Sequence, residues 1–133
     1  RFVVGLNVNG VPTWTLTDVL QIVKAVRVDQ IGADGRSGAT LHHCVGLYMS
    51  GDMVEEEKSV SIAIDNTTSS EEEFDEQMLF LAEEIAGRLS QQTVLYQIYE
   101  NGRMVGSWYV TARDDIEPYN VERAQRKLMR KKR

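Results

Sequence analysis

The order of the hydrophobic patterns predicts an α+β fold of the ferredoxin-like type, a split βαβ sandwich. Segments in which apolar and polar residues alternate, as they do in half-buried strands, are interrupted by two segments with helical spacing, in the order β-α-β-β-α-β. One more alternating segment follows, after a tight Asn-Gly turn. We therefore expect an antiparallel sheet with two helices on one face, plus an extra C-terminal hairpin strand.

The N-terminal part of the chain predicts one strand and one helix. Residues 2–9 alternate between apolar and polar side chains, and Asn9-Gly10 followed by Pro12 marks a turn. Thr15 is placed to cap a helix, with Asp18 three residues later to complete a capping box. A wide apolar stripe then predicts a helix near residues 16–29.

The middle of the chain predicts a loop and two strands. Residues 31–38 hold three glycines, but this segment follows a helix, whereas a phosphate loop follows a strand and opens a helix. Residues 40–50 and 58–65 have the composition and alternation of strands that could pair as an antiparallel hairpin. We expect Gly51-Asp52 and the run Glu55–Glu57 to form an exposed connection between them.

The last third predicts the strongest helix and a hairpin. Ser69 or Ser70 can cap a helix over about residues 71–90, whose apolar residues from Phe74 to Leu89 recur every three or four positions. Residues 93–99 and 104–111 then alternate on either side of Asn101-Gly102, which favours a type I′ turn because both residues accept a positive φ.

The charge is distributed unevenly along the 133 residues. Residues 1–120 hold eight basic and nineteen acidic side chains, a net charge of −11, and residues 121–133 have a net charge of +6. With Pro118 and a change of composition near Asp114, this predicts one domain over residues 1–113 and a basic C-terminal tail over residues 114–133. Cys44, the single cysteine, favours a reducing, cytoplasmic setting, and no apolar run is long enough to span a membrane.

Four segments of the body resemble small bacterial and phage proteins of uncharacterised function that share this strand and helix order. They are residues 2–8, 58–65, 74–89 and 92–96. The resemblance covers most of residues 2–111 and implies the ferredoxin-like fold. It implies no functional residue, because no catalytic motif is shared.

His42, His43 and Cys44 are the residues whose types best suit metal binding or nucleophilic catalysis. In a strand, however, His42 and Cys44 face one way and His43 the other, and residues two apart lie roughly 6–7 Å from each other. We therefore predict no metal, no cofactor and no catalytic residue. The paired carboxylates, among them Glu71–Asp75–Glu76, are interpreted as solvated; mimicry of nucleic acid by the acidic body, as in a phage-encoded inhibitor, is the other interpretation.

These observations favour a non-enzymatic binding or assembly protein that forms a homo-oligomer, such as a dimer, or engages a protein partner through the open face of its sheet. Aromatic residues are enriched at interfaces, and the partner-binding candidates are Trp14, Tyr99, Trp108 and Tyr109.

Two alternatives remain open. The first is a nucleic-acid-associated protein that neutralises phosphates with its tail, through Arg123, Arg126, Lys127, Arg130, Lys131, Lys132 and Arg133. The second is a small enzyme or ligand sensor built around His42, His43 and Cys44.

Overall fold

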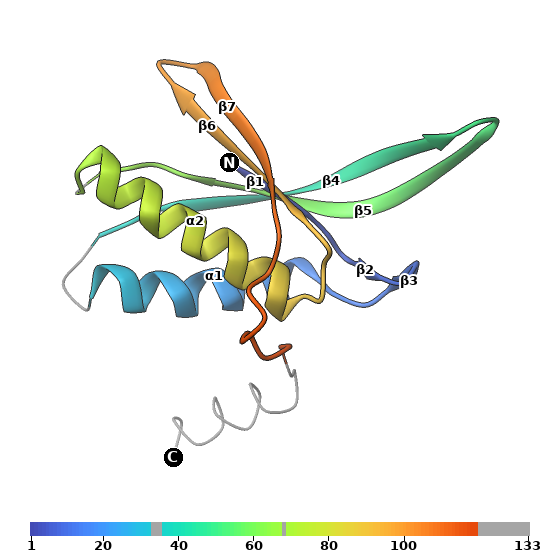
Figure 1. Cartoon of the computed structure of the whole chain (residues 1–133), viewed down its shortest axis with the longest axis horizontal. Coiled ribbons are helices and arrows are strands. Elements are labelled where there is room, and N and C mark those ends of the chain that lie inside the picture. Colours follow the sequence, from blue (N-terminus) through green and yellow to red (C-terminus); the bar gives the residue numbers. More distant parts are fainter. Residues whose placement is uncertain (33–35, 68, 120–133) are drawn as a thin grey trace.

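The computed structural model describes residues 1–32, 36–67 and 69–119 of the chain. A five-stranded antiparallel sheet and two α-helices form an α+β fold, which confirms the predicted class (Figure 1). The sheet order β4-β5-β1-β6-β7 is consistent with a split βαβ arrangement. In chain order the elements are β1 (Phe2–Gly5), β2 (Asn7–Val8), β3 (Val11–Pro12), α1 (Leu16–Ile31), β4 (Ala39–Ser50), β5 (Met53–Ile64), α2 (Glu71–Arg88), β6 (Val94–Glu100) and β7 (Arg103–Val110).

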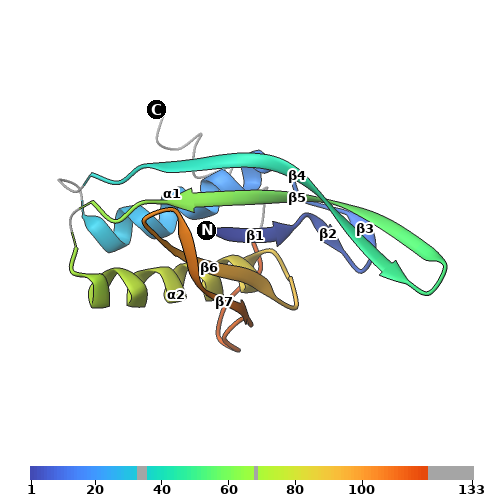
Figure 2. The same cartoon turned by 90° about the horizontal axis from the view of Figure 1, so that it is seen from above.

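The core lies between the two helices and one face of the sheet. The short strand β1 is central, and its Phe2 is opposite Ile62 of β5 and Tyr96 of β6. Phe2 and Val4 of β1, Val60 and Ile62 of β5 and Val94 and Tyr96 of β6 are buried at alternate positions, because successive side chains of a strand point to opposite faces. The helices lie side by side (Figures 1 and 2) and contribute apolar residues such as Ile22 and Leu81.

Both helices begin at the capping residues that the sequence predicts. The Thr15 hydroxyl accepts from the Asp18 backbone N–H at 3.3 Å, and Asp18 Oδ2 accepts from the Thr15 N–H at 2.9 Å, which completes the capping box. Ser70 Oγ accepts from the Glu73 N–H at 3.2 Å and caps α2. At the last hairpin, Asn101 and Gly102 have φ values of 51° and 78°, as a type I′ turn requires.

The connection between β4 and β5 differs from the prediction. Glu55–Glu57 lie inside β5, which starts at Met53, so the turn contains only Gly51 and Asp52. The strands extend because Met49 pairs with Val54 and Ser50 with Met53, on an arm that projects beyond the helices (Figure 1). Glu55 and Glu56 are exposed, whereas Glu57 is partly buried and accepts from the Asn7 N–H at 3.4 Å. The predicted strand over residues 2–9 is likewise divided into β1 and β2, and β2 pairs with β3.

The segment after β7 returns to pack on α2. The Tyr119 N–H donates to the Arg88 carbonyl at 2.7 Å, and Ile116 lies against Gly87, where a β-carbon would meet its side chain. In the part of the chain that the structure describes, no helix is both long and apolar enough to cross a membrane. The basic residues from Arg123 to Arg133 lie outside the described residues.

Candidate functional site

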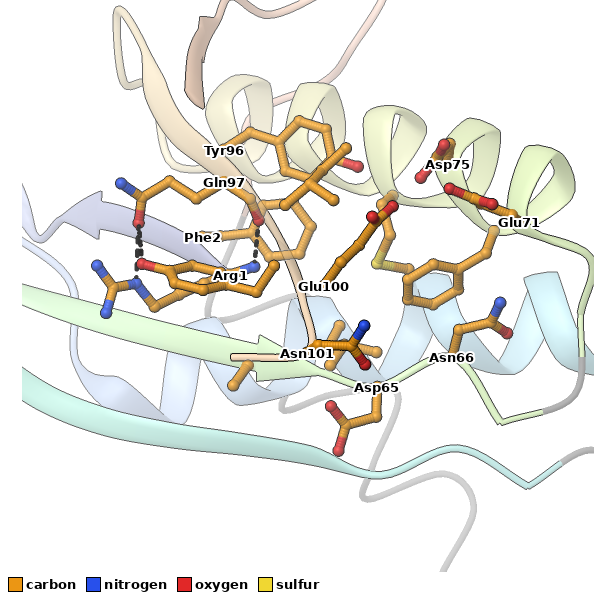
Figure 3. A pocket seen from close by; sticks show the side chains of 16 residues that line it. Arg1, Phe2, Asp65, Asn66, Glu71, Asp75, Tyr96, Gln97, Glu100 and Asn101 are labelled. Atoms are coloured by element: carbon orange, nitrogen blue, oxygen red, sulfur yellow. Dashed lines mark hydrogen bonds between the residues drawn. The ribbon is translucent and has the colours of Figure 1, made fainter. Parts of the chain in front are cut away.

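A cavity of about 730 Å³ opens at one end of the sandwich, where β1 starts and β5 and β6 end, beside the N-terminal half of α2 (Figure 3). Its size is in the usual range for a small-molecule site.

The walls of the cavity are aromatic and aliphatic. The rings of Phe2 and Tyr96 are stacked, with centroids 5.3 Å apart and an angle of 15° between their planes. Ile98 extends this surface along β6, and Phe74 and Met78 face it from α2. A flat apolar wall of this kind suits a planar heterocycle or an aliphatic group.

Four carboxylates line the same cavity: Asp65 after β5, Glu71 and Asp75 on α2, and Glu100 at the end of β6 (Figure 3). Glu71 and Asp75 are four residues apart and so lie on the same face of the helix. Within residues 1–32, 36–67 and 69–119, none of the four forms a salt bridge. Their charge is therefore available to a ligand.

Tyr96 brings a polar group into the apolar part of the cavity. Its side chain is only 7% exposed, and burial together with the nearby Asp75 carboxylate raises the pKa of Tyr96 to about 12. The hydroxyl consequently keeps its proton at neutral pH. No described residue forms a hydrogen bond with this hydroxyl, and its oxygen is accessible to solvent, so it can donate to a bound molecule.

Arg1 is the single basic residue among those that line the cavity. Its Nε donates to Gln97 Oε1 at 3.0 Å, and its guanidinium lies 5.5 Å from the centre of the Tyr99 ring. Figure 3 shows Arg1 and Gln97 on one side of the cavity, turned away from Asp65, Glu71 and Asp75. The arrangement as a whole suits a ligand that combines an aromatic ring with positive charge.

The four aromatic residues predicted to bind a partner do not form one patch. Tyr99 lines the cavity, and Trp108, 50% exposed, lies beside Tyr96 with ring centroids 5.8 Å apart. Tyr109 is 74% exposed and pairs with Leu95 on the other face of the sheet. Trp14 is half-buried at the opposite end of α2, where its Nε1 donates to the Leu89 carbonyl at 2.8 Å.

His42, His43 and Cys44 lie on β4 and do not line the cavity. His42 and Cys44 are opposite Ser61 and Ser59, and His43 is opposite Val60, so the three alternate between faces as a strand requires. Among the described residues, no group of three or more His, Cys, Asp or Glu is arranged to hold a metal ion.

The sequence did not predict this site, and it placed Glu71 and Asp75 on a solvated helix face. A weak signal was nevertheless present. Asp65 and Glu100 each stand at the end of a strand, and Glu71 stands at the start of a helix. Only the sheet order brings these element ends to the same edge of the molecule.

Fold and cavity together define a small α+β domain with an acidic, aromatic-lined cavity. Two solved structures resemble the chain. The first is a phage SAM lyase in its apo state, at 31% sequence identity and a TM-score of 0.71, over 84% of this chain and 86% of that one. The second is a phage SAM lyase in complex with S-methyl-5′-thioadenosine, at 29% identity and a TM-score of 0.66, over the same shares. No protein-family model and no curated protein sequence matches.

The chain belongs to the family of this phage SAM lyase. The prediction of a non-enzymatic binding or assembly protein is therefore wrong, because the structures that it resembles are those of an enzyme. The error has a physical cause. Fold class and net charge do not specify chemistry, and the sequence contains no catalytic motif that would have indicated it.

Proposed function

We propose that the protein is a lyase that cleaves S-adenosylmethionine and releases S-methyl-5′-thioadenosine. The observation that carries this proposal is the 31% identity to a phage SAM lyase over 84% of the chain. The cavity supports it independently, because S-adenosylmethionine combines a planar purine with a sulfonium and an ammonium group. Those features match an aromatic wall beside four carboxylates.

The ligand named in the related complex identifies the bond that breaks. S-methyl-5′-thioadenosine keeps the adenosine, the sulfur and the methyl group of S-adenosylmethionine. The cleaved bond therefore joins the sulfur to the γ-carbon of the methionine chain, and the sulfur leaves with the bonding electrons as a neutral thioether. Without added water, the remaining four-carbon amino acid balances its electrons either by closing onto its own carboxylate or by losing a β-proton.

In this proposal the walls hold the nucleoside. The stacked pair of Phe2 and Tyr96 and the side chain of Phe74 provide flat apolar surface for the adenine. The protonated Tyr96 hydroxyl donates a hydrogen bond to a ring nitrogen or a ribose oxygen. The carboxylates at the rim, which are acceptors only, bind ribose hydroxyls and the ammonium group.

Electrostatics favour the ammonium over the sulfonium as the partner of the carboxylates. The sulfonium loses its charge as the bond breaks, so a carboxylate in contact with sulfur would stabilise the substrate more than the transition state. The ammonium keeps its charge throughout the reaction. A sulfur against the apolar wall, with the ammonium near Glu100 or Asp65, therefore gives the faster reaction.

Incubation of the purified protein with S-adenosylmethionine tests the proposal. We expect S-methyl-5′-thioadenosine to accumulate in chromatography, with no ¹⁸O from labelled water in the four-carbon product. Glu100→Gln should lower kcat/KM about tenfold, which corresponds to about 1.4 kcal/mol. Glu72→Gln is the matched control, because Glu72 is exposed and does not line the cavity. Absence of product from the unmodified protein would refute the function.

A homo-oligomer in the cytoplasm remains part of the proposal. The outer face of the sheet carries Val3, Leu95 and the exposed Tyr109 in one row of paired residues, a surface that a second copy could cover. Light scattering of the wild type and of Tyr109→Glu tests this, since the charge should dissociate an assembly formed on that face. An unchanged mass for Tyr109→Glu would exclude this face as the interface.

A further inference from the structure

We infer that the cavity selects its ligand by positive charge and leaves the substrate's carboxylate unbound, so that decarboxylated adenosyl compounds bind more tightly than their amino-acid counterparts. The inference rests on the proposed function, since it takes an adenosyl compound as the ligand. It adds a ligand class, adenosyl amines without a carboxylate, that the function does not require.

The first step is the charge balance of the lining. Asp65, Glu71, Asp75 and Glu100 contribute four carboxylates, and Arg1 contributes one guanidinium and one α-ammonium, which interacts with Asp65, so negative charge is in excess. A ligand carboxylate that enters this space meets like charges, while an amine meets opposite charges. The cavity is open to water, which weakens both effects without changing their sign.

The second step is the position of Arg1. Its Nε is already bonded to Gln97 Oε1 at 3.0 Å, and its guanidinium lies over the Tyr99 ring at 5.5 Å from the centre. Figure 3 shows it directed away from Asp65 and Asp75. To bind a carboxylate among the acids, Arg1 would have to leave both partners.

The third step shows that the cavity is built for a ligand and is not only an acidic surface. Tyr96 lines the cavity, the residue is only 7% exposed, and no described residue forms a hydrogen bond with its hydroxyl. The hydroxyl oxygen itself is accessible to solvent, so a bound molecule can take the place of water as the acceptor of its hydrogen bond. The hydroxyl donates to the uncharged nucleoside part of the ligand. The carboxylates then interact with the charged groups of the ligand's side chain.

A matched pair of unreactive ligands isolates the carboxylate. S-adenosylhomocysteine and its decarboxylated analogue, adenosyl thiopropylamine, both have a neutral sulfur, so neither is expected to be cleaved. They differ only in the carboxylate. Isothermal titration of the unmodified protein at low salt should give about tenfold tighter binding of the amine, and this preference should shrink as salt is added.

Variants then assign the preference to the cavity. Glu100→Gln and Asp65→Asn should each reduce the ratio of the two affinities about threefold, and Glu72→Gln, on the exposed side of α2, should leave it unchanged. S-methyl-5′-thioadenosine, which has no charged group, should bind all four proteins about equally.

The possible outcomes separate this inference from the proposed function. Equal or tighter binding of S-adenosylhomocysteine, with S-adenosylmethionine still cleaved, overturns the inference alone. If neither ligand nor S-methyl-5′-thioadenosine binds and S-adenosylmethionine is not cleaved, both fail. A preference for the amine that Glu100→Gln and Asp65→Asn leave intact overturns the assignment to this cavity.

Discussion

The two halves of α2 carry carboxylates that serve opposite purposes. In the C-terminal half, Glu84 is 7% exposed and is held by Arg113 at 2.6 Å and Arg88 at 2.8 Å. In the N-terminal half, Glu71 and Asp75 face the open cavity, and neither forms a salt bridge with any described residue.

This contrast shows that the surroundings of a carboxylate decide what it contributes. A buried acid that is fully paired holds the C-terminal segment against the helix, and Arg113 adds a contact over the Phe80 ring at 4.4 Å. An unpaired acid beside an apolar wall adds little to the fold and remains free to bind a cation. The following variants test whether stability and binding are divided in this way.

The largest effect on stability is expected for Glu84→Gln. Loss of the charge leaves Arg88 without its ion-pair partner and Arg113 with only the longer pairs to Glu83 and Asp115. We expect a destabilisation of about 2 kcal/mol, below the value for a fully buried pair because both arginines are partly exposed. Urea denaturation measures it. Affinity for S-methyl-5′-thioadenosine should stay the same, and an unchanged unfolding midpoint would contradict the structural role of this pair.

Asp75→Asn should have the opposite effects to Glu84→Gln: it should weaken substrate binding and leave stability nearly unchanged. Since Asp75 has no salt bridge to lose among the described residues, the free energy of unfolding should change by less than about 0.5 kcal/mol. The KM for S-adenosylmethionine should rise about fivefold, which is about 1 kcal/mol. Steady-state kinetics and urea denaturation of the same preparation check both parts. A destabilisation as large as that of Glu84→Gln would abolish the contrast between the two halves of the helix.

Phe74→Leu should weaken charged and neutral ligands alike. The substitution removes an aromatic face from the cavity wall and keeps most of the apolar volume, so the loss is about threefold for S-methyl-5′-thioadenosine and for adenosyl thiopropylamine. Titration calorimetry with both ligands gives the two ratios. Phe80→Leu is the control, because Phe80 lies outside the cavity on the same helix. If Phe74→Leu weakened the binding of adenosyl thiopropylamine alone, Phe74 would recognise the positive charge, which contradicts the role given to the carboxylates.

Tyr96→Phe has the smallest expected effect on stability at neutral pH and a distinct one in alkali. Burial raises the pKa of Tyr96 to about 12 from its ordinary value of 10.0, so the folded protein favours the neutral phenol. The stability that this preference contributes is present below pH 10 and is lost as the pH rises through about 12. Phenolate absorbance is measured as a function of pH for both proteins. The curve of the wild type minus that of Tyr96→Phe should show one tyrosine that ionises well above pH 10. A difference curve with its midpoint near pH 10 would show that Tyr96 is solvated.

Local chemistry made much of the fold predictable. Thr15, with Asp18, and Ser70 cap the two helices through bonds that span three residues. Asn101-Gly102 forms its turn through its own positive φ angles. Such features depend on neighbours along the chain, so a sequence pattern is enough to reveal them.

Other features depend on distant partners. The β4–β5 arm extends through Glu55–Glu57 because Met49 and Val54 pair across it, and the alternation of apolar residues ends before that point. Trp14 could be read as either a core residue or a partner contact. The structure directs its indole to the Leu89 carbonyl, 75 residues away.

By itself, the sequence determined the order of the elements, their caps and turns, and the amphipathic faces that form the core, because each of these is set by residues a few positions apart. Only the tertiary structure decided the cavity. The sheet order β4-β5-β1-β6-β7 brings the ends of β5 and β6 and the start of α2 to one edge, so that Asp65, Glu71, Asp75 and Glu100 line one cavity together with Tyr96. A carboxylate that is solvated on a helix and one that lines a cavity look the same in the sequence. They differ only in which segments, distant along the chain, pack beside them.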